Sequence, residues 1–246
     1  TNRLVGVTIG FLIFLTAWSS RVYLKSDKTV FYLSLGSFFL VGFQGWLGSS
    51  VVASNLKPVV ITLHMLLALV LVALLIYTIA RSQRVYLTQI DTQLLPDKFK
   101  TVLIAAMIMT LLQVVMGTQV REAVDFIARE HIERQYWRDD FPIIFYIHRS
   151  FSSIILFTNA WLVWKIYQSF DKQNLLFRTG LALAVLVVIA ILAGVSLDRL
   201  GVPAMVQPIH LLMANLIFGV QFFLYACLNY SATKHKQIGS KVQGHA

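Results

Sequence analysis

The sequence predicts an all-α polytopic membrane protein, and three observations support this prediction. Of the 246 residues, 57% are hydrophobic and 13% are charged, and the mean hydropathy is +0.71; soluble domains carry about 25% charged residues. The apolar residues form seven runs, each near the roughly 20 residues that a helix needs to cross a bilayer. None of the runs alternates like a barrel strand, and backbone groups in lipid must be hydrogen-bonded within their segment, so the runs are predicted to be helices.

The connections between the helices indicate their orientation. The predicted crossings are residues 3–23, 30–51, 58–80, 101–119, 142–168, 178–197 and 204–229. The connections and tail on one side carry 13 basic and 4 acidic residues, whereas the other side carries 8 basic and 7 acidic residues. Basic residues concentrate in cytoplasmic loops, so Thr1 is predicted outside and the C-terminal tail in the cytoplasm. These loops account for the net charge of +10, and no nucleic-acid partner is expected.

The chain contains an internal duplication, in which the two copies differ by a constant offset in residue number. This repeat offset carries Asn2 to His148 and His64 to His210, and without a gap it also carries Arg3 to Arg149, Trp18 to Trp164, Gly48 to Gly194 and Ala68 to Ala214. A repeat of this kind indicates two related structural units. The second unit has four predicted helices and the first has three, so a further helix is expected ahead of Thr1.

The duplication divides the chain into four predicted segments. Residues 1–82 form an N-terminal half-bundle, three helices of an expected four, and residues 83–99 form a cytoplasmic linker. Residues 100–229 form a C-terminal four-helix bundle, and residues 230–246 form a cytoplasmic tail. Four-helix bundles commonly hold cofactors between facing helices.

His148 and His210 are the leading candidates for functional residues. The stretch between them holds one crossing inward and one outward, so both are predicted at the same depth near the outer leaflet. Histidine in a membrane helix is costly and usually functional, and two facing histidines can supply both axial ligands of a haem iron. Zinc is disfavoured because no Cys, Asp or Glu stands nearby. Hydrogen-bonded structural histidines are the alternative.

His64 forms the corresponding pair with Asn2. Asparagine is a poor ligand for haem iron, so this half is predicted to hold a haem with one strong protein ligand, His64. The second face of the iron is then open or weakly occupied, which suits reaction, whereas a bis-histidine iron suits electron transfer. A structural role for His64 is the alternative.

Arginines follow both first positions of these pairs. Arg149 follows His148 and Arg3 follows Asn2, and each is predicted near the outer leaflet. Such arginines can bind haem propionates through charge-assisted hydrogen bonds or extend to lipid headgroups. The same two alternatives apply to Arg121.

Two further features are assigned mainly structural roles. Gln44 and Gln113 each lie in a Gln-x-x-x-Gly sequence, with Gly48 and Gly117, and small residues there favour close helix packing. The longest outer connection, residues 120–141, has apolar residues on one helical face. It is predicted to contain an amphipathic helix at the membrane interface, with a lid over an outer-leaflet site as the alternative.

The histidine motifs resemble those of the haem A synthase family. The C-terminal half contains Ile147-His148-Arg149 and Pro208-Ile209-His210-Leu211, the N-terminal half contains Leu63-His64-Met65, and Met116-Gly117-Thr118-Gln119-Val120-Arg121 resembles the family's helix-end motif. The similarity covers the whole chain. It implies eight membrane helices in two pseudo-symmetric halves, each with two histidines.

The resemblance also implies an activity. The family oxidises a methyl group of haem O to the formyl group of haem A, a cofactor of terminal oxidases, and the haem supplies the chemistry. By this resemblance His148, His210 and Arg149 hold a b-type haem, and His64 and Asn2 bind the substrate. The expected partners are haem O, haem O synthase, an electron-transfer protein and membrane lipid, with homo-oligomerisation left open. The expected location is the bacterial cytoplasmic membrane.

The sequence departs from the family pattern at the N-terminal half. Asn2 stands at the first histidine position, and the family's glutamate belongs three residues earlier, ahead of Thr1. Phe145 stands at the equivalent place of the C-terminal half. The catalytic residue is therefore unassigned, and activity is expected of the full-length protein rather than of residues 1–246 alone. The alternatives are a non-catalytic membrane cytochrome b that carries electrons, and a haem-transfer or assembly protein.

Overall fold

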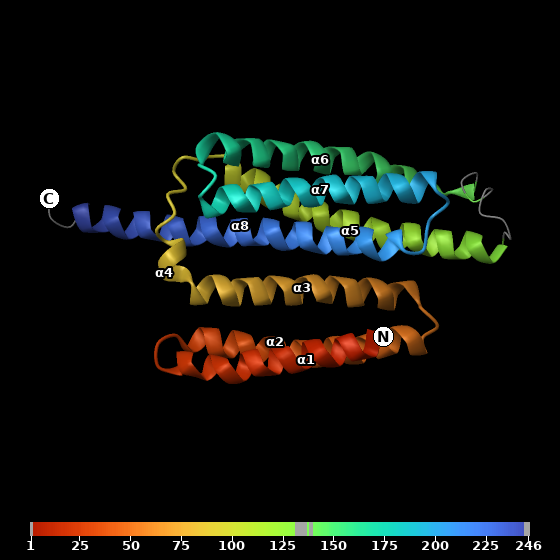
Figure 1. Cartoon of the computed structure of the whole chain (residues 1–246), viewed down its shortest axis with the longest axis horizontal. Helices are drawn as coiled ribbons and strands as arrows, with labels where there is room; N and C mark the ends of the chain where they lie inside the picture. The colour runs from red at the N-terminus through yellow and green to blue at the C-terminus, as the bar shows by residue number, and fades with distance from the viewer. Residues whose placement is uncertain (1, 131–136, 138–139, 244–246) are drawn as a thin grey trace. The chain divides into compact units, whose positions relative to one another are not determined.

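The computed structural model consists of helices (Figure 1). It describes the backbone of residues 2–130, 137 and 140–243, and their side chains except those of residues 2–3 and 232–243. No strand occurs within these ranges, so the predicted all-α fold is confirmed. The elements are α1 (Asn2–Ser19), η1 (Ser20–Leu24), α2 (Lys28–Ala53), α3 (Pro58–Ser82), α4 (Arg84–Leu87), α5 (Phe99–Glu130), α6 (Ile143–Ser169), α7 (Leu175–Arg199) and α8 (Val206–Gln243).

Six helical stretches of the described chain are long and apolar enough to cross a membrane. They are α1 with η1, α2, α3, α5, α7 and α8 up to Ser231. Many large apolar side chains on them are exposed, as lipid contact requires and as water would disfavour. Helix α6 has 27 residues, but His148, Arg149 and Asn159 make it more polar. The polytopic membrane fold is confirmed, and the crossing by α6 stays a prediction.

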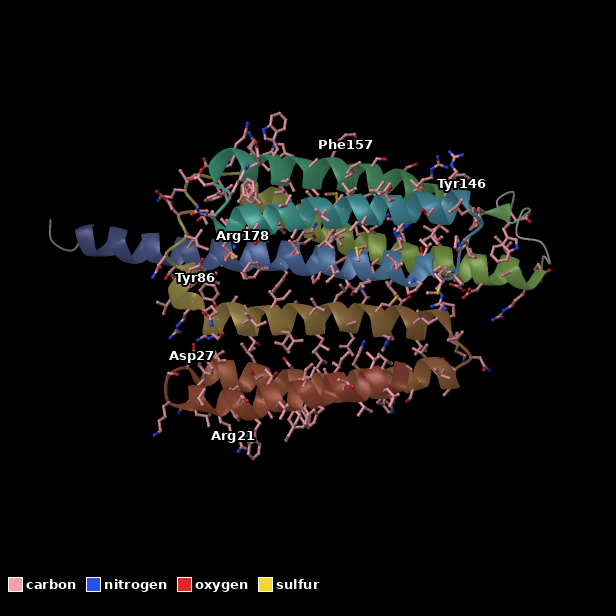
Figure 2. The ribbon with its side chains drawn as sticks, in the orientation of Figure 1. Arg21, Asp27, Tyr86, Tyr146, Phe157 and Arg178 are labelled. Atoms are coloured by element: carbon pink, nitrogen blue, oxygen red, sulfur yellow. The ribbon has the colours of Figure 1, made fainter. Side chains whose placement is uncertain are left out.

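Figure 2 shows the outward-facing character of α6 at Phe157, whose side chain projects away from the helix. This ring is 72% exposed, whereas Asn159, two residues later, is 1% exposed. The polar residue therefore faces the inside of its bundle and the aromatic residue faces outward. A membrane bundle favours this arrangement because unpaired polar groups in lipid cost several kcal/mol each.

Helix α5 extends beyond its predicted end. The sequence predicted a crossing over 101–119 and an amphipathic helix in the outer connection 120–141, and the structure has one helix of 32 residues that continues to Glu130. Val124 and Ile127 continue the buried face of α5 and form a small core with Trp137 and Phe141. Burial of these side chains stabilises the same helix through the amphipathic stretch. The predicted helix is therefore present up to Glu130, but it continues α5 instead of following an outer connection that begins at residue 120.

The turns that precede α3 and α8 support the duplication. Asn55 and Leu56 have φ values of 56° and 63°, and Gly201 and Val202 have values of 65° and 55°. The amide of Leu56 donates to Val51 O at 3.0 Å, and that of Val202 donates to Leu197 O at 3.1 Å. These bonds close the ends of α2 and α7 in the manner of a Schellman motif. The repeat offset relates each of these positions to its counterpart.

The chain divides into two compact units, and each is described by itself. The first comprises residues 1–90 and 230–246, and the second comprises residues 91–229. In the second unit, α5, α6, α7 and α8 up to Asn229 run alongside one another (Figure 1). Its core contains Leu103, Leu162 and Leu183, each at 0% exposure. In the first unit, ring contacts join α1 to α2, with Phe14 and Phe38 centred 5.7 Å apart.

Asp27 joins the elements of the first unit at the predicted cytoplasmic end (Figure 2). It caps α2 by accepting the Thr29 amide at 3.2 Å. Its carboxylate also accepts Arg81 Nε at 3.0 Å and Arg84 Nη1 at 2.8 Å. One acidic side chain thereby links the start of α2 to the end of α3 and to α4. Asp27 is the only acidic residue in residues 1–90 and 230–246.

Acid should destabilise this junction. The hydrogen-bonded Arg81 side chain is the main cause that lowers the pKa of Asp27, and Thr29 and Arg84 lower the pKa further. A carboxyl group with a lowered folded-state pKa contributes stability that is fully present above about pH 4 and is lost as the pH falls through the folded-state pKa. Thermal unfolding of the first unit should be insensitive to pH between about 7 and 5 and should occur at lower temperature below about pH 4.

Asp27→Asn should remove this acid-dependent step. At pH 7 it should lower the free energy of unfolding by about 1–3 kcal/mol, as expected for hydrogen bonds to charged groups. Scanning calorimetry of the purified protein in detergent measures both effects. Asp171→Asn, at an exposed position between α6 and α7, is the control and should behave as wild type. An unchanged acid transition of the first unit in Asp27→Asn would show that another group causes it.

Candidate functional site

The rings of His148 and His210 lie close together inside the second unit. Their centroids are 6.4 Å apart and their planes are inclined by 73°. Each is near the start of a helix, because α6 begins at Ile143 after Pro142 and α8 begins at Val206. Both helices thus begin at the same end of the bundle. Two histidines that are far apart in the sequence are thus brought together edge-on, near the same end of the bundle.

Each of the three membrane histidines packs against a glycine of the preceding helix. A Cβ atom added at Gly48 would lie 3.2 Å from Cε1 of His64. The same atom at Gly117 would lie 3.4 Å from Cε1 of His148, and at Gly194 3.3 Å from Cε1 of His210. A side chain at any of these positions would press on an imidazole ring. The glycines therefore leave space for the histidines, which is more specific than the general helix packing predicted from Gln-x-x-x-Gly.

The glutamines of the two Gln-x-x-x-Gly sequences bind the histidine backbones. Gln44 Nε2 donates to His64 O at 2.8 Å, and Gln113 Nε2 donates to His148 O at 3.0 Å. Gln113 Nε2 is also 3.4 Å from Nε2 of His148. Each glutamine thus connects its helix to the next one at the level of the histidine. This pairing was not visible in the sequence, because it depends on how the helices pack.

His210 is held differently. Its Nδ1 atom lies 3.0 Å from the carbonyl oxygen of Ala190, which stands one turn before Gly194 and replaces Gln44 under the repeat offset. A carbonyl oxygen only accepts, so this bond requires the proton on Nδ1. The Nε2 lone pair of His210 is then available to a metal ion, an arrangement typical of metal-binding histidines.

The described residues fit a haem better than a metal ion held by protein alone. Among them no group of three His, Cys, Asp or Glu side chains could surround a metal ion. A haem iron needs only one or two axial ligands from the protein. An imidazole–metal bond is about 2 Å long, so two such bonds and two ring radii span about 6 Å, close to the observed 6.4 Å.

Buried polar atoms beside the histidines support the same interpretation. Oε1 of Gln113 and Nδ1 of His148 are buried without a hydrogen-bond partner, and so are Oε1 of Gln44 and Nδ1 of His64. Buried polar atoms are nearly always paired. The histidine surroundings in both units therefore contain donors and acceptors that a bound group, or the rotation of a ring on ligation, can satisfy.

In the first unit, only part of the predicted site lies among the described residues. His64 lies on α3, in contact with Gly48 and Gln44 of α2. Asn2 is the first residue of α1, but its side chain and that of Arg3 lie outside the described residues. The pairing of Asn2 with His64, predicted from the duplication, stays a prediction.

Arg149 has a protein partner that the sequence did not reveal. Its Nη1 atom is 3.4 Å from Asp198 Oδ2 on α7, and Nε of Arg199 is 3.9 Å from the same oxygen. The side chain of Asp198 is 10% exposed and that of Arg149 is 49% exposed. Guanidinium has five N–H donors, so Arg149 can bind Asp198 and a further acceptor together. Arg121 pairs along its own helix with Asp125, at 3.5 Å.

Phe145 belongs to an apolar cluster near His148. Its ring centroid is 4.3 Å from that of Phe141, and it packs with Val120 and Val202 around Val124, Ile127 and Trp137. The position that precedes His148 by three residues therefore has a packing role in this half. His131, in the outer connection, and His235 and His245, in the tail, lie outside the residues whose side chains are described.

Comparison with protein families identifies the chain. A family model described as cytochrome oxidase assembly protein, COX15-CtaA, matches residues 1–222. The matched range includes His64, His148 and His210. A comparison with individually curated proteins gave no match. The resemblance to haem A synthases noted from the histidine motifs is thereby confirmed for the family, and the chain belongs to the COX15-CtaA family of cytochrome oxidase assembly proteins.

Proposed function

We propose that the full-length protein is a haem A synthase, which oxidises a methyl group of haem O to the formyl group of haem A. The observation that carries this proposal is the His148–His210 pair, with ring centroids 6.4 Å apart, in a chain that belongs to a family of cytochrome oxidase assembly proteins. The conversion removes electrons from carbon and adds oxygen, so it needs a redox group. A haem in the second unit meets that need.

In the second unit, His148 and His210 are the proposed axial ligands of a b-type haem. Such a haem supplies one-electron transfer when bound, and two strong ligands suit that role. Gly117 and Gly194 leave space for the two imidazoles, and Ala190 O fixes the proton of His210 on Nδ1. Arg149, oriented by Asp198, is the proposed partner of a propionate.

In the first unit, His64 is the proposed ligand of the substrate haem, and Asn2 is the proposed weak partner. Gln44 holds the backbone of His64, and Gly48 gives its ring space. A substrate site must release its product, whereas a cofactor site must retain its haem. The one strong ligand proposed for the first unit and the two proposed for the second would account for that difference.

Filling the space beside His64 should impair the proposed substrate site. Gly48→Leu places atoms where a Cβ is already 3.2 Å from the imidazole, whereas nothing lies within 4 Å of a Cβ at Gly45. Gly48→Leu should lower the rate of haem A formation at least about tenfold, comparable to loss of a supporting contact at a metal ligand. Gly45→Leu, on the same helix, is the matched control and should retain the wild-type rate. Equal rates for both variants would remove His64 from the substrate site.

An electron-carrying cytochrome b is the second candidate, and the bis-histidine pair itself favours it. The two functions are distinguished by incubating the full-length protein with haem O in membranes and extracting the haems afterwards. Pyridine haemochrome analysis identifies the resident haem, and chromatography identifies the product. Haem A formed from haem O supports the synthase. A b-type haem that is only reduced and reoxidised, with haem O recovered unchanged, supports the carrier. Haem O that is bound and handed on unaltered supports a haem-transfer protein.

The proposed setting follows from the membrane fold. The protein is an integral membrane protein, and we place it in a bacterial cytoplasmic membrane with its tail in the cytoplasm. Haem O, a haem O synthase that supplies it and an electron-transfer partner are proposed to meet it there. His148 and His210 lie toward the end of their bundle where α6 and α8 begin, which is the outer end in this orientation.

A further inference from the structure

A buried chain of polar side chains crosses the second unit below the histidine pair. Gln221 Nε2 on α8 donates to Asn159 Oδ1 on α6 at 2.9 Å. Asn159 Nδ2 donates to Ile155 O, one turn earlier, at 2.8 Å. The Thr110 hydroxyl on α5 lies 3.1 Å from Gln221 Oε1 and 2.9 Å from Ala106 O, so its single proton can reach either acceptor. Thr110, Asn159 and Gln221 are 4%, 1% and 0% exposed.

This chain is aligned with the proposed iron ligands. Asn159 follows His148 on α6 by the same interval at which Gln221 follows His210 on α8. Along an α-helix this interval corresponds to about three full turns plus a rotation of about 20°, and to a rise of about 16 Å. Asn159 therefore lies on the same face of α6 as His148, and Gln221 lies on the same face of α8 as His210. The two helices face each other through histidines at one level and through amides three turns away.

A hydrogen bond at such a position fixes how two helices are rotated against each other. Two apolar side chains pack in many nearly equal ways, whereas an amide pair bonds in few. Burial of either amide without its partner carries a desolvation penalty, so rotation or sliding of α6 against α8 is strongly opposed. Single buried asparagines set the register of coiled coils in this way. The Thr110 contact extends the same constraint to α5, which carries Gln113 and Gly117 on its next two turns.

The first unit has apolar residues at the corresponding places. The repeat offset relates Asn159 to Ile13 and Gln221 to Leu75. Neither can form a side-chain hydrogen bond, so α1 and α3 have no equivalent constraint at this level. The amide pair is thus specific to the unit with two histidine ligands and is not a general requirement of the repeated fold.

We propose that Thr110, Gln221 and Asn159 are positioning residues that set the rotation of α6 against α8, and through it the relative orientation of the His148 and His210 rings. The inference rests on the proposed function, because it takes the two histidines as ligands of a retained haem. The polar chain holds the two ligands in one geometry, as a cofactor that is never exchanged requires. The apolar counterpart in the first unit leaves its helices free to adjust as substrate enters and product leaves.

The test is the double variant Asn159→Leu with Gln221→Met in the full-length protein. Replacing both partners by apolar groups of similar size leaves no amide unpaired, so stability should change little. The electron paramagnetic resonance spectrum should change, because the g-values of a low-spin haem depend on the angle between its two imidazole planes. We expect one sharp low-spin species in wild type and a broadened or multiple signal in the double variant. Haem loss to an excess of apomyoglobin should be about tenfold faster.

Two further variants separate positioning from stability. Thr179→Val removes a buried hydroxyl that bonds only within its own helix, to Leu175 O at 2.8 Å, and should leave the low-spin signal and the rate of haem loss unchanged. Thr110→Val has nearly the same shape as wild type and keeps the Gln221–Asn159 bond, so it should broaden the signal partly. It also provides the test should the double variant fail to fold.

The outcomes distinguish this inference from the function on which it rests. A wild-type protein without a bis-histidine haem would overturn both. A wild-type low-spin signal reproduced with the same g-values and the same rate of haem loss in the folded double variant would overturn the positioning role alone. If only Thr110→Val can be purified, an unchanged signal in that variant has the same meaning. A lower unfolding temperature with unchanged g-values would assign the amides a purely structural role and would also overturn the inference.

Discussion

Replacing either His148 or His210 by alanine should abolish the low-spin b-type spectrum of the full-length protein. The rings are 6.4 Å apart, which leaves room for one iron between them. Changes to residues that merely support a ligand typically cost about 10–100-fold in metal affinity, so loss of a ligand itself should cost more. The purified variants should contain little b-type haem, and any that remains should be high-spin because one axial position is open.

The measurement is the reduced-minus-oxidised spectrum together with the haem content per protein. Asn215→Ala provides a control on α8, because Asn215 is half-buried and its side chain bonds within its own helix, to Leu211 O at 2.9 Å. It should retain the wild-type signal. A full-strength bis-histidine spectrum in either histidine variant would show that another residue ligates the iron.

The histidine pair was predictable from the sequence because residue type, spacing and the internal repeat each point to the same positions. Histidine is rare in apolar helices, and the spacing of His148 and His210 matches one crossing inward and one outward. The repeat offset then marked His64 as the counterpart of His210. These signals depend only on chain length per crossing and on residue type, which is why they could be found without the tertiary structure.

The partners of the histidines depend on packing and could not be assigned. The Gln-x-x-x-Gly sequences were visible, but their contacts to His64 and His148 arise from neighbouring helices. Asp198 was counted only as an outer charge, since its approach to Arg149 depends on the rotation of α7 against α6. Asn159 and Gln221 are isolated amides in apolar runs, and no local pattern shows that they meet. Each of these contacts can be recognised only when the faces that two neighbouring helices present to each other are known.

The extent of α5 illustrates a different limit. Charged residues after position 120 suggested the end of a crossing, and the apolar face that follows suggested an amphipathic helix. The stretch is helical up to Glu130, but its continuity with α5 is decided by burial of that face, here Val124 and Ile127 against Trp137 and Phe141. Composition indicates where a helix leaves the hydrocarbon and does not indicate where the helix itself ends.

The second large effect is expected at His64. In the full-length protein, His64→Ala should abolish the formation of haem A and leave the spectrum of the C-terminal b-type haem nearly intact. His64 belongs to the first unit, whereas His148 and His210 belong to the second, and its ring packs on Gly48. The variant therefore removes the only histidine of residues 1–90 and leaves every residue of the second unit unchanged. Haem A formation at the wild-type rate would contradict the assignment of the substrate to His64.

Asn2→His tests the reason for the difference between the halves. In the pairing that the duplication predicts, a histidine at position 2 would give the substrate iron a second strong ligand, as proposed for the second unit, and would favour a low-spin, retained haem. Haem retention in the first half should therefore increase and product release should slow, while binding of haem O persists. Titration of haem O into wild type and both variants, followed by haem extraction, measures binding and turnover separately. Faster product release from Asn2→His would contradict the argument that a second strong ligand retains the haem. It would leave His64 as the proposed binding residue, because that assignment depends on the outcome of His64→Ala.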